Sequence, residues 1–249
     1  MALTPLQTLN GTLTLIYVII STIIGLKIAS KYLKYKKREL ILVGLTWIIL
    51  MEIYWSSAFS FVAAIITGTG FEDNPRLYFT IGNLFVPIGL FMWLMAFTDF
   101  MYKKSQKVIL LIAAITGAIY YIVFFYFIFT DVSVIGKIYS PVDAEYRGFA
   151  LLYLISVLLI FLITGIMFAL ESLKSENSEI RLKGKFLLIA VISFAVGTGL
   201  DGLKPFLFES YLEIVLVITR IILLSCAIEF YLGFNPPHWL KKILLKEVE

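Results

Sequence analysis

Cysteine and histidine are almost missing from this 249-residue sequence, which contains one of each, Cys226 and His238. A disulfide within the chain is therefore excluded, as are a metal site built from His and Cys ligands and a haem held by two histidines. The sequence motifs of zinc metalloproteases, serine hydrolases and phosphate-binding loops are also missing. No lysine lies between residues 212 and 240, which excludes a retinal Schiff base in the last apolar segment. We expect no enzyme activity and no cofactor.

Charged residues are scarce as well. They make up 15% of the chain, whereas hydrophobic residues reach 60% and the mean hydropathy is +0.94. Soluble domains have roughly 25% charged and about 45–50% apolar residues. The composition therefore excludes a water-soluble enzyme, a disordered chain and a small disulfide-stabilised domain, and it indicates an all-α, polytopic membrane protein.

Seven apolar segments, each bounded by charged residues, predict helices that cross a bilayer, which takes about 20 residues per crossing. They span residues 9–30, 40–66, 77–102, 108–130, 148–170, 186–203 and 212–234. We therefore predict a seven-helix membrane domain over residues 1–234, followed by a tail over residues 235–249. The loops are too short to hold a second folded domain.

Lys and Arg are divided unequally between the two sides of the predicted bundle. Sixteen lie on the side of the C-terminal tail, and only Arg76, Lys137, Arg147 and Lys204 lie on the other, with Arg220 inside the seventh segment. Because cytoplasmic loops carry the excess of basic residues, we predict an outside N-terminus and a cytoplasmic C-terminus in the cell membrane. The basic residues are expected to contact anionic lipid headgroups, and no nucleic-acid partner is expected.

Two charged residues lie deep inside predicted membrane segments, where each charge costs about 2.5–3.5 kcal/mol. Glu52 in the second segment and Arg220 in the seventh have similar depths, which predicts an ion pair between them. Trp55 lies about one helical turn from Glu52 and is expected on a similar face. We interpret the pair either as a static lock on helix order or as a switch beside a polar ligand pocket.

Other residues predict a hinge and a ligand entrance. Pro87, inside the third segment, is expected to bend that helix. An acidic outer mouth is expected from Asp201, Glu209 and Glu213. The longest outer loop, residues 131–147, is long enough to pack over the bundle as a lid. Asn10-Gly11-Thr12 is a glycosylation sequon on the outer side, but it directly adjoins the first helix.

The tail has the pattern of a short amphipathic helix. Pro236 and Pro237 end the seventh segment. The residues 238–246 that follow place Trp239 and other apolar side chains on one face and Lys241 and Lys242 on the other. We predict that this helix lies on the inner leaflet and offers a surface to a partner.

The stretches GFNPPHWLKK (residues 233–242) and EIRLKGK (residues 179–185) resemble the seven-helix membrane sensor regions of prokaryotic histidine kinases and related regulators. In that family the junction after the last helix leads into an output domain, whereas this sequence ends at Glu249. The resemblance therefore implies a sensor module that passes its signal to a separate protein.

Three functions remain open at this point. The first is a membrane-embedded sensor or receptor-like module with a protein partner. The second is a small transporter or channel that uses the buried charges, although no internal repeat supports it. The third is a structural subunit of a membrane complex. The sequence does not identify a ligand.

Overall fold

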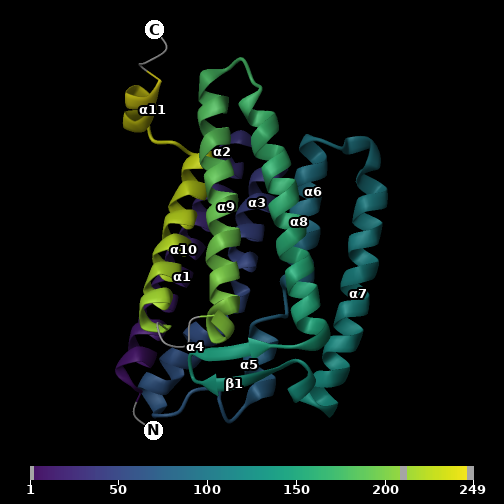
Figure 1. The fold of residues 1–249 in the computed structure, drawn as a ribbon. Helices are drawn as coiled ribbons and strands as arrows, with labels where there is room; N and C mark the ends of the chain where they lie inside the picture. Colours follow the sequence, from purple (N-terminus) through teal and green to yellow (C-terminus); the bar gives the residue numbers. More distant parts are fainter. Residues whose placement is uncertain (1–2, 208–211, 246–249) are drawn as a thin grey trace.

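The computed structural model describes residues 3–207 and 212–245, with the backbone alone for residues 203–207, 212 and 213. In these residues the chain is helical apart from one two-stranded hairpin (Figure 1). The long helices run lengthwise beside one another. The N-terminus and the hairpin lie at one end of the bundle, here called the hairpin end, and the C-terminal helix lies at the other, here called the tail end.

Each predicted segment lies mostly on helix. The helices are α1 (Pro5–Ser30), α2 (Tyr32–Tyr35), α3 (Arg38–Leu50), α4 (Glu52–Thr67), α5 (Pro75–Ile81), α6 (Val86–Phe100), α7 (Gln106–Thr130), α8 (Gly148–Leu173), α9 (Ser178–Leu207), α10 (Leu212–Phe234) and α11 (His238–Leu244). Short 3-10 turns, η1 (Lys103–Ser105) and η2 (Val132–Val134), precede and follow α7. Several helices are long and apolar enough to cross a membrane: five continuous spans in the described residues, or six if α3 and α4 form one bent span. The sixth predicted segment, 186–203, lies in α9.

Two spans are interrupted, the bent α3–α4 span near its middle and the α5–α6 span nearer its start. Between α3 and α4 the axis bends by 53° at Met51. Between α5 and α6 the chain leaves the helix over residues 82–85. The sequence predicts one helix over 40–66 and one over 77–102, so these two breaks correct the predicted segments. Pro87 falls in the first turn of α6, where its missing N–H costs no hydrogen bond.

The predicted lid is a β-hairpin. β1 (Gly136–Ser140) pairs with β2 (Asp143–Tyr146) in antiparallel register, with Gly136 opposite Tyr146. The hairpin lies across the hairpin end of the bundle (Figure 1). Ile135 and Val142 beside the strands are buried, and Ile135 joins an aromatic cluster with Phe79 and Phe124. This packing fixes the loop over the helices as a cover.

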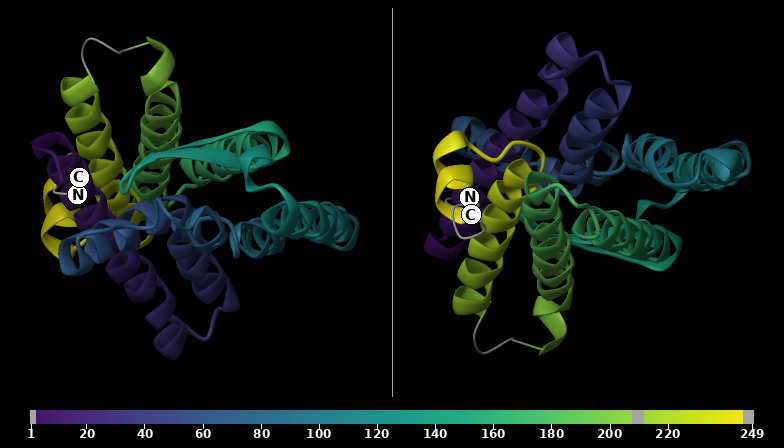
Figure 2. Two further views of the ribbon diagram at one scale, coloured as in Figure 1. Left: turned by 90° about the horizontal axis from the view of Figure 1, so that it is seen from below. Right: turned by 90° about the horizontal axis from the view of Figure 1, so that it is seen from above.

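The helices are arranged unevenly around the bundle. Views along the axis place α7 at one edge, apart from α1 and α10 (Figure 2). The main apolar core joins α1, α3, α6, α8, α9 and α10, and includes a stack of Trp47 on Phe230 with ring centroids 4.0 Å apart. Large apolar side chains remain exposed along α7 and α8, such as Ile122 and Leu152. Such surfaces suit contact with lipid.

Helices α1 and α3 approach most closely at two glycines. A Cβ atom on Gly44 would lie 2.5 Å from the Gly25 carbonyl oxygen and 2.6 Å from the Ala29 nitrogen. Those neighbours are backbone atoms, which cannot move aside as a flexible side chain can. Only glycine therefore allows this contact.

We predict that Gly44→Ala destabilises the bundle. Overpacking typically costs about 1–3 kcal/mol, so the midpoint of thermal unfolding in detergent should fall. Gly199→Ala is the matched control, because a Cβ there meets no atom within 4 Å and alanine favours helix. Equal unfolding midpoints for the two variants would contradict the tight contact.

Candidate functional site

Arg220 of α10 is the most deeply buried basic side chain in the described residues. Its Nη1 donates to Asp201 Oδ2 of α9 at 3.2 Å, and its Nη2 donates to Asn10 Oδ1 of α1 at 3.1 Å. The guanidinium lies over the ring of Tyr54 of α4, 5.1 Å from the centroid. These four residues, Asn10, Tyr54, Asp201 and Arg220, are called the Arg220 cluster below. The cluster thus joins four helices around one cation.

Asn10 connects this cluster to the hairpin. While its Oδ1 accepts from Arg220, its Nδ2 donates to the Val142 carbonyl oxygen between the two strands, at 3.2 Å. Thr14, one turn along α1, also donates to Asn10 Oδ1. The Asn10 side chain is buried, and its amide nitrogen is already used in this bond. The folded protein therefore does not present the sequon at residues 10–12 for glycosylation.

Glu52 does not pair with Arg220, and the predicted ion pair is wrong. Glu52 is fully buried, and both of its carboxylate oxygens accept from the Phe85 N–H, at 2.7 and 2.9 Å. Residues two apart on a helix point to different faces. Since Tyr54 of α4 faces Arg220, Glu52 faces away from it, toward the break before α6. Counting residues along a helix gives the depth of a charged side chain, but not the face of the helix on which it lies.

The Glu52 carboxylate is part of a second polar group, at the break in the α5–α6 span. Tyr121 of α7 donates to the Leu84 carbonyl oxygen at 2.6 Å, and Tyr120 donates to Asn83 Oδ1 at 2.9 Å. Asn83 Nδ2 in turn donates to the Phe79 carbonyl oxygen and to the Tyr146 hydroxyl of β2. Glu52, Asn83, Tyr120, Tyr121 and Tyr146 form the Glu52 cluster. Glu52, Asn83 and Tyr121 satisfy backbone groups around the break, and Tyr120 and Tyr146 hold the Asn83 side chain in place.

The remaining predicted site residues take separate positions. Trp55 is partly buried and packs near Phe59, on the edge of the main core. Pro87 of α6 packs close to Gly117 of α7, where an added Cβ atom would lie 3.1 Å from the Pro87 Cβ. Of the predicted acidic mouth, Asp201 belongs to the Arg220 cluster, while Glu209 and the side chain of Glu213 lie outside the described residues. Within the described part of the chain, no three His, Cys, Asp or Glu side chains are placed to hold a metal ion.

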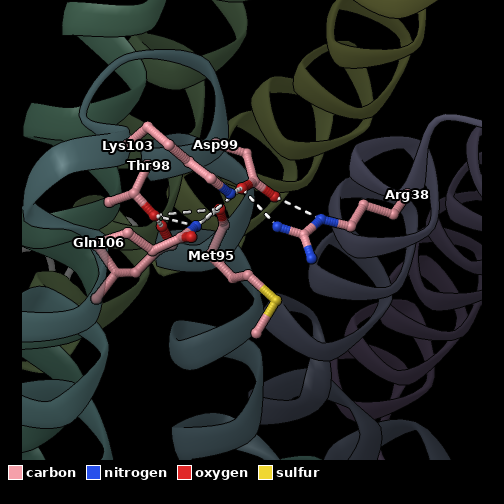
Figure 3. A network of polar contacts seen from close by, with 7 residues as sticks. Arg38, Met95, Thr98, Asp99, Lys103 and Gln106 are labelled. Carbon is pink, nitrogen blue, oxygen red and sulfur yellow. Dashed lines mark hydrogen bonds and ion pairs between the residues drawn. The ribbon is translucent and has the colours of Figure 1, made fainter.

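A charged network ties the helices together at the tail end (Figure 3). The buried carboxylate of Asp99 accepts two hydrogen bonds from Arg38, at 2.8 and 2.6 Å, and further bonds from Lys103 and Gln106. Gln106 also donates to Thr98. This network joins the start of α3 to the end of α6 and the start of α7.

Helix α11 is held to the bundle by polar contacts from other helices. Lys241 contacts Glu179 Oε1 of α9 at 2.7 Å, and Lys183 contacts the same oxygen at 2.7 Å. Lys31 of α1 donates to the carbonyl oxygen of Phe234, at the end of α10. Pro237 is the N-cap residue of α11.

The predicted amphipathic tail is helical over 238–244, and its apolar side chains face outward. Trp239 is 62% exposed and Ile243 61% exposed, and Lys242 is exposed as well. Pro236 and Pro237 interrupt the helix between α10 and α11, as predicted. The structure describes the tail up to residue 245.

Comparisons with protein-family models, with curated proteins and with solved structures find no match to this chain. The interpretation of the two clusters therefore depends on their geometry.

Sequence reasoning missed Asn10 and Asn83, which connect the two clusters to the hairpin. Each is an amide side chain close to or inside an apolar run, where an unpaired polar group is costly. That signal was available for both residues. Their partners were not, because Val142 and Tyr146 lie far away in the sequence.

We predict that Glu52 and Arg220 act independently on stability, whereas Asp201 and Arg220 are coupled. A double-mutant cycle with Glu52→Gln and Arg220→Gln should give an interaction energy within about 0.5 kcal/mol of zero. The matched cycle with Asp201→Asn and Arg220→Gln should give about 0.5–3 kcal/mol, because each single change leaves a buried charge without its partner. Chemical unfolding in mixed micelles measures both. Strong coupling between Glu52 and Arg220 in the first cycle would instead support the ion pair predicted from the sequence.

We predict that acid releases α11 only at low pH. Hydrogen bonds from Lys183 and Lys241 lower the pKa of Glu179 from its ordinary 4.5 to about 2. A lowered carboxyl pKa means that the contact is fully present above pH 4.5 and is lost as the pH falls toward 2. A spin label at position 243 should therefore keep its mobility down to pH 4.5 and become more mobile below it. Glu179→Gln should be mobile at every pH, and a mobility change near pH 6 would contradict the assignment.

Proposed function

We propose that this chain is a seven-helix sensor or receptor-like module of the plasma membrane, with its N-terminus outside, which passes a signal to a separate protein at its cytoplasmic face. The observation that carries the proposal is the double role of Asn10. One side chain contacts the hairpin cover through Val142 and the membrane-buried Arg220 at the same time.

The proposed input is a movement of the hairpin at the outer end. A ligand shifts a conformational equilibrium only if it interacts differently with the two states. Lifting the Val142 carbonyl from Asn10 would remove one of the three hydrogen bonds that position the Asn10 amide. Hydrogen bonds to charged groups contribute about 1.5–3 kcal/mol, so a change at Asn10 is large enough to move Arg220.

The proposed transmitter is α10. It is a continuous helix from Leu212 to Phe234, and it carries Arg220 in its first half. Its last residue, Phe234, accepts the hydrogen bond from Lys31, and α11 begins four residues later at His238. Because a helix moves as a stiff unit, a shift of Arg220 relative to α1 is carried to this junction.

The proposed output is the surface of α11. Its exposed Trp239 and Ile243 and its basic residues suit a place at the inner leaflet, against anionic headgroups, from which a protein partner reads its position. The excess of Lys and Arg at the tail end supports the cytoplasmic assignment of that end.

One observation favours a small transporter as a second candidate. Two spans are broken, and the Glu52–Phe85 contact joins the start of α4 to the start of α6 across these breaks. Transporters use broken helices to form binding sites near the middle of the bilayer. A transporter would open the Glu52 cluster to the two sides in turn, so that a cysteine at the buried Ser56 would react with a polar thiol reagent from either side. The sensor proposal predicts no such alternation.

The sensor proposal predicts that Asn10→Ala changes the position of α11. Spin labels attached at positions 243 and 170, through Ile243→Cys and Leu170→Cys in a Cys226→Ala background, report the distance between α11 and α8. Asn10→Ala and Arg220→Gln should each shift or broaden this distance distribution. The matched control is Thr12→Ala, which also removes the sequon but changes an exposed side chain of the same helix. An unchanged distribution in both test variants would leave α11 a passive anchor.

A further inference from the structure

Several polar atoms near Arg220 are buried without a protein partner. On α10 these are Thr219 Oγ1 and Arg220 Nε, and on α1 they are the hydroxyls of Tyr17 and Ser21. All four residues are at most 3% exposed. The Tyr17 ring packs edge-on against Tyr54, with centroids 5.3 Å apart, and Tyr54 lies under the Arg220 guanidinium, so Tyr17 borders the Arg220 cluster. Tyr17 and Ser21 lie next to each other, and beyond that contact their hydroxyls, like Thr219 Oγ1 and Arg220 Nε, have no partner among the described residues.

Water is the partner that suits this region. A buried polar group without a hydrogen bond is unfavourable, and lipid tails offer no donor or acceptor. Buried water molecules in proteins typically bridge two to four such groups. Hydroxyls can donate and accept, whereas Arg220 Nε only donates, and water complements both. The charges of Arg220 and Asp201 make the region still more favourable for water.

The packing indicates from which end this water enters. Toward the tail end, Trp47 stacks on Phe230, and Leu223 and Met51 are fully buried beside them. Toward the hairpin end, the Asp201 side chain is 16% exposed, whereas that of its partner Arg220 is 4% exposed. The Arg220 cluster therefore reaches the surface at Asp201 and is closed by apolar side chains on the other side.

Buried hydroxyls nearer the tail end behave differently. Thr98 donates to the Leu94 carbonyl oxygen, and Thr164 accepts from Trp93 and donates to the Ile160 carbonyl oxygen. Protein groups satisfy these side chains. Single buried atoms without a protein partner also occur elsewhere, such as Trp47 Nε1 and Tyr153 Oη, whereas around Arg220 several lie close together.

We propose that the region between α1 and α10 around Arg220 is a binding site for internal water that is continuous with the solution at the hairpin end, and that it admits small hydrophilic solutes as far as Arg220. This inference adds an entry path to the proposed sensor, but it requires neither signalling nor a particular orientation in the cell.

Cysteine accessibility in proteoliposomes tests the site. In a Cys226→Ala background, Thr219→Cys should react with a small charged methanethiosulfonate added from the side on which Asp73→Cys reacts. The matched control is Ile218→Cys, the neighbouring residue on α10, which is exposed on the outside of the bundle where lipid lies. Since charged groups enter hydrocarbon poorly, position 219 should react at least about tenfold faster than position 218. Equal and slow reaction at both positions, with position 73 fully labelled, would overturn the proposal.

The unmodified protein provides a second test that does not depend on the folding of a variant. Radiolytic hydroxyl-radical footprinting oxidises side chains next to bound water. Tyr17 is fully buried, yet it should be oxidised, and Tyr126, which is exposed to the lipid side of α7, should be oxidised less. A silent Tyr17 would overturn the proposal even if cysteine variants misfold. Neither test involves Asn10 or α11, so failure here is distinguishable from failure of the sensor mechanism.

Discussion

The placement of a guanidinium inside an apolar bundle is the constraint on which the surrounding structure depends. Arg220 cannot lose its charge, so its donors need acceptors that lipid cannot supply. Asp201, Asn10 and the ring of Tyr54 meet this need from α9, α1 and α4. Three helices must therefore surround α10 on one side at the depth of Arg220, and this fixes their order as firmly as apolar packing does.

The two broken spans follow from the same requirement applied to the backbone. A helix can stop inside a membrane protein only where other groups complete its hydrogen bonds. Around the break at 82–85, Glu52 of α4 accepts from the Phe85 N–H and Tyr121 of α7 donates to the Leu84 carbonyl oxygen, while Tyr146 of β2 accepts from the Asn83 side chain. Glu52 thus binds the N-terminus of α6, where the positive end of the helix dipole also favours a carboxylate. Its burial needs no basic partner.

Much of the fold could be predicted from one-dimensional information, whereas the site could not. The length of each apolar run and its charged ends located the helices, and the two prolines located the start of α11. Depth along a helix can also be counted, and it put Glu52 and Arg220 at similar heights. Which face a side chain occupies depends on the neighbours of the helix, and the breaks at Met51 and residues 82–85 alter that face further. The pairing therefore required the three-dimensional arrangement.

The polar groups at the two ends of the bundle find their hydrogen-bond partners in different ways. At the tail end, Asp99 accepts bonds from three side chains of α3, η1 and α7, so this buried carboxylate is satisfied by protein groups. At the hairpin end, Asn10 is the described link between the cover and Arg220, and neighbouring hydroxyls lack protein partners. Polar atoms that lack protein partners can take their hydrogen bonds from water or from a solute. In the sensor that we propose, such a change would reach α11 through the continuous helix α10 and the junction at Pro236 and Pro237.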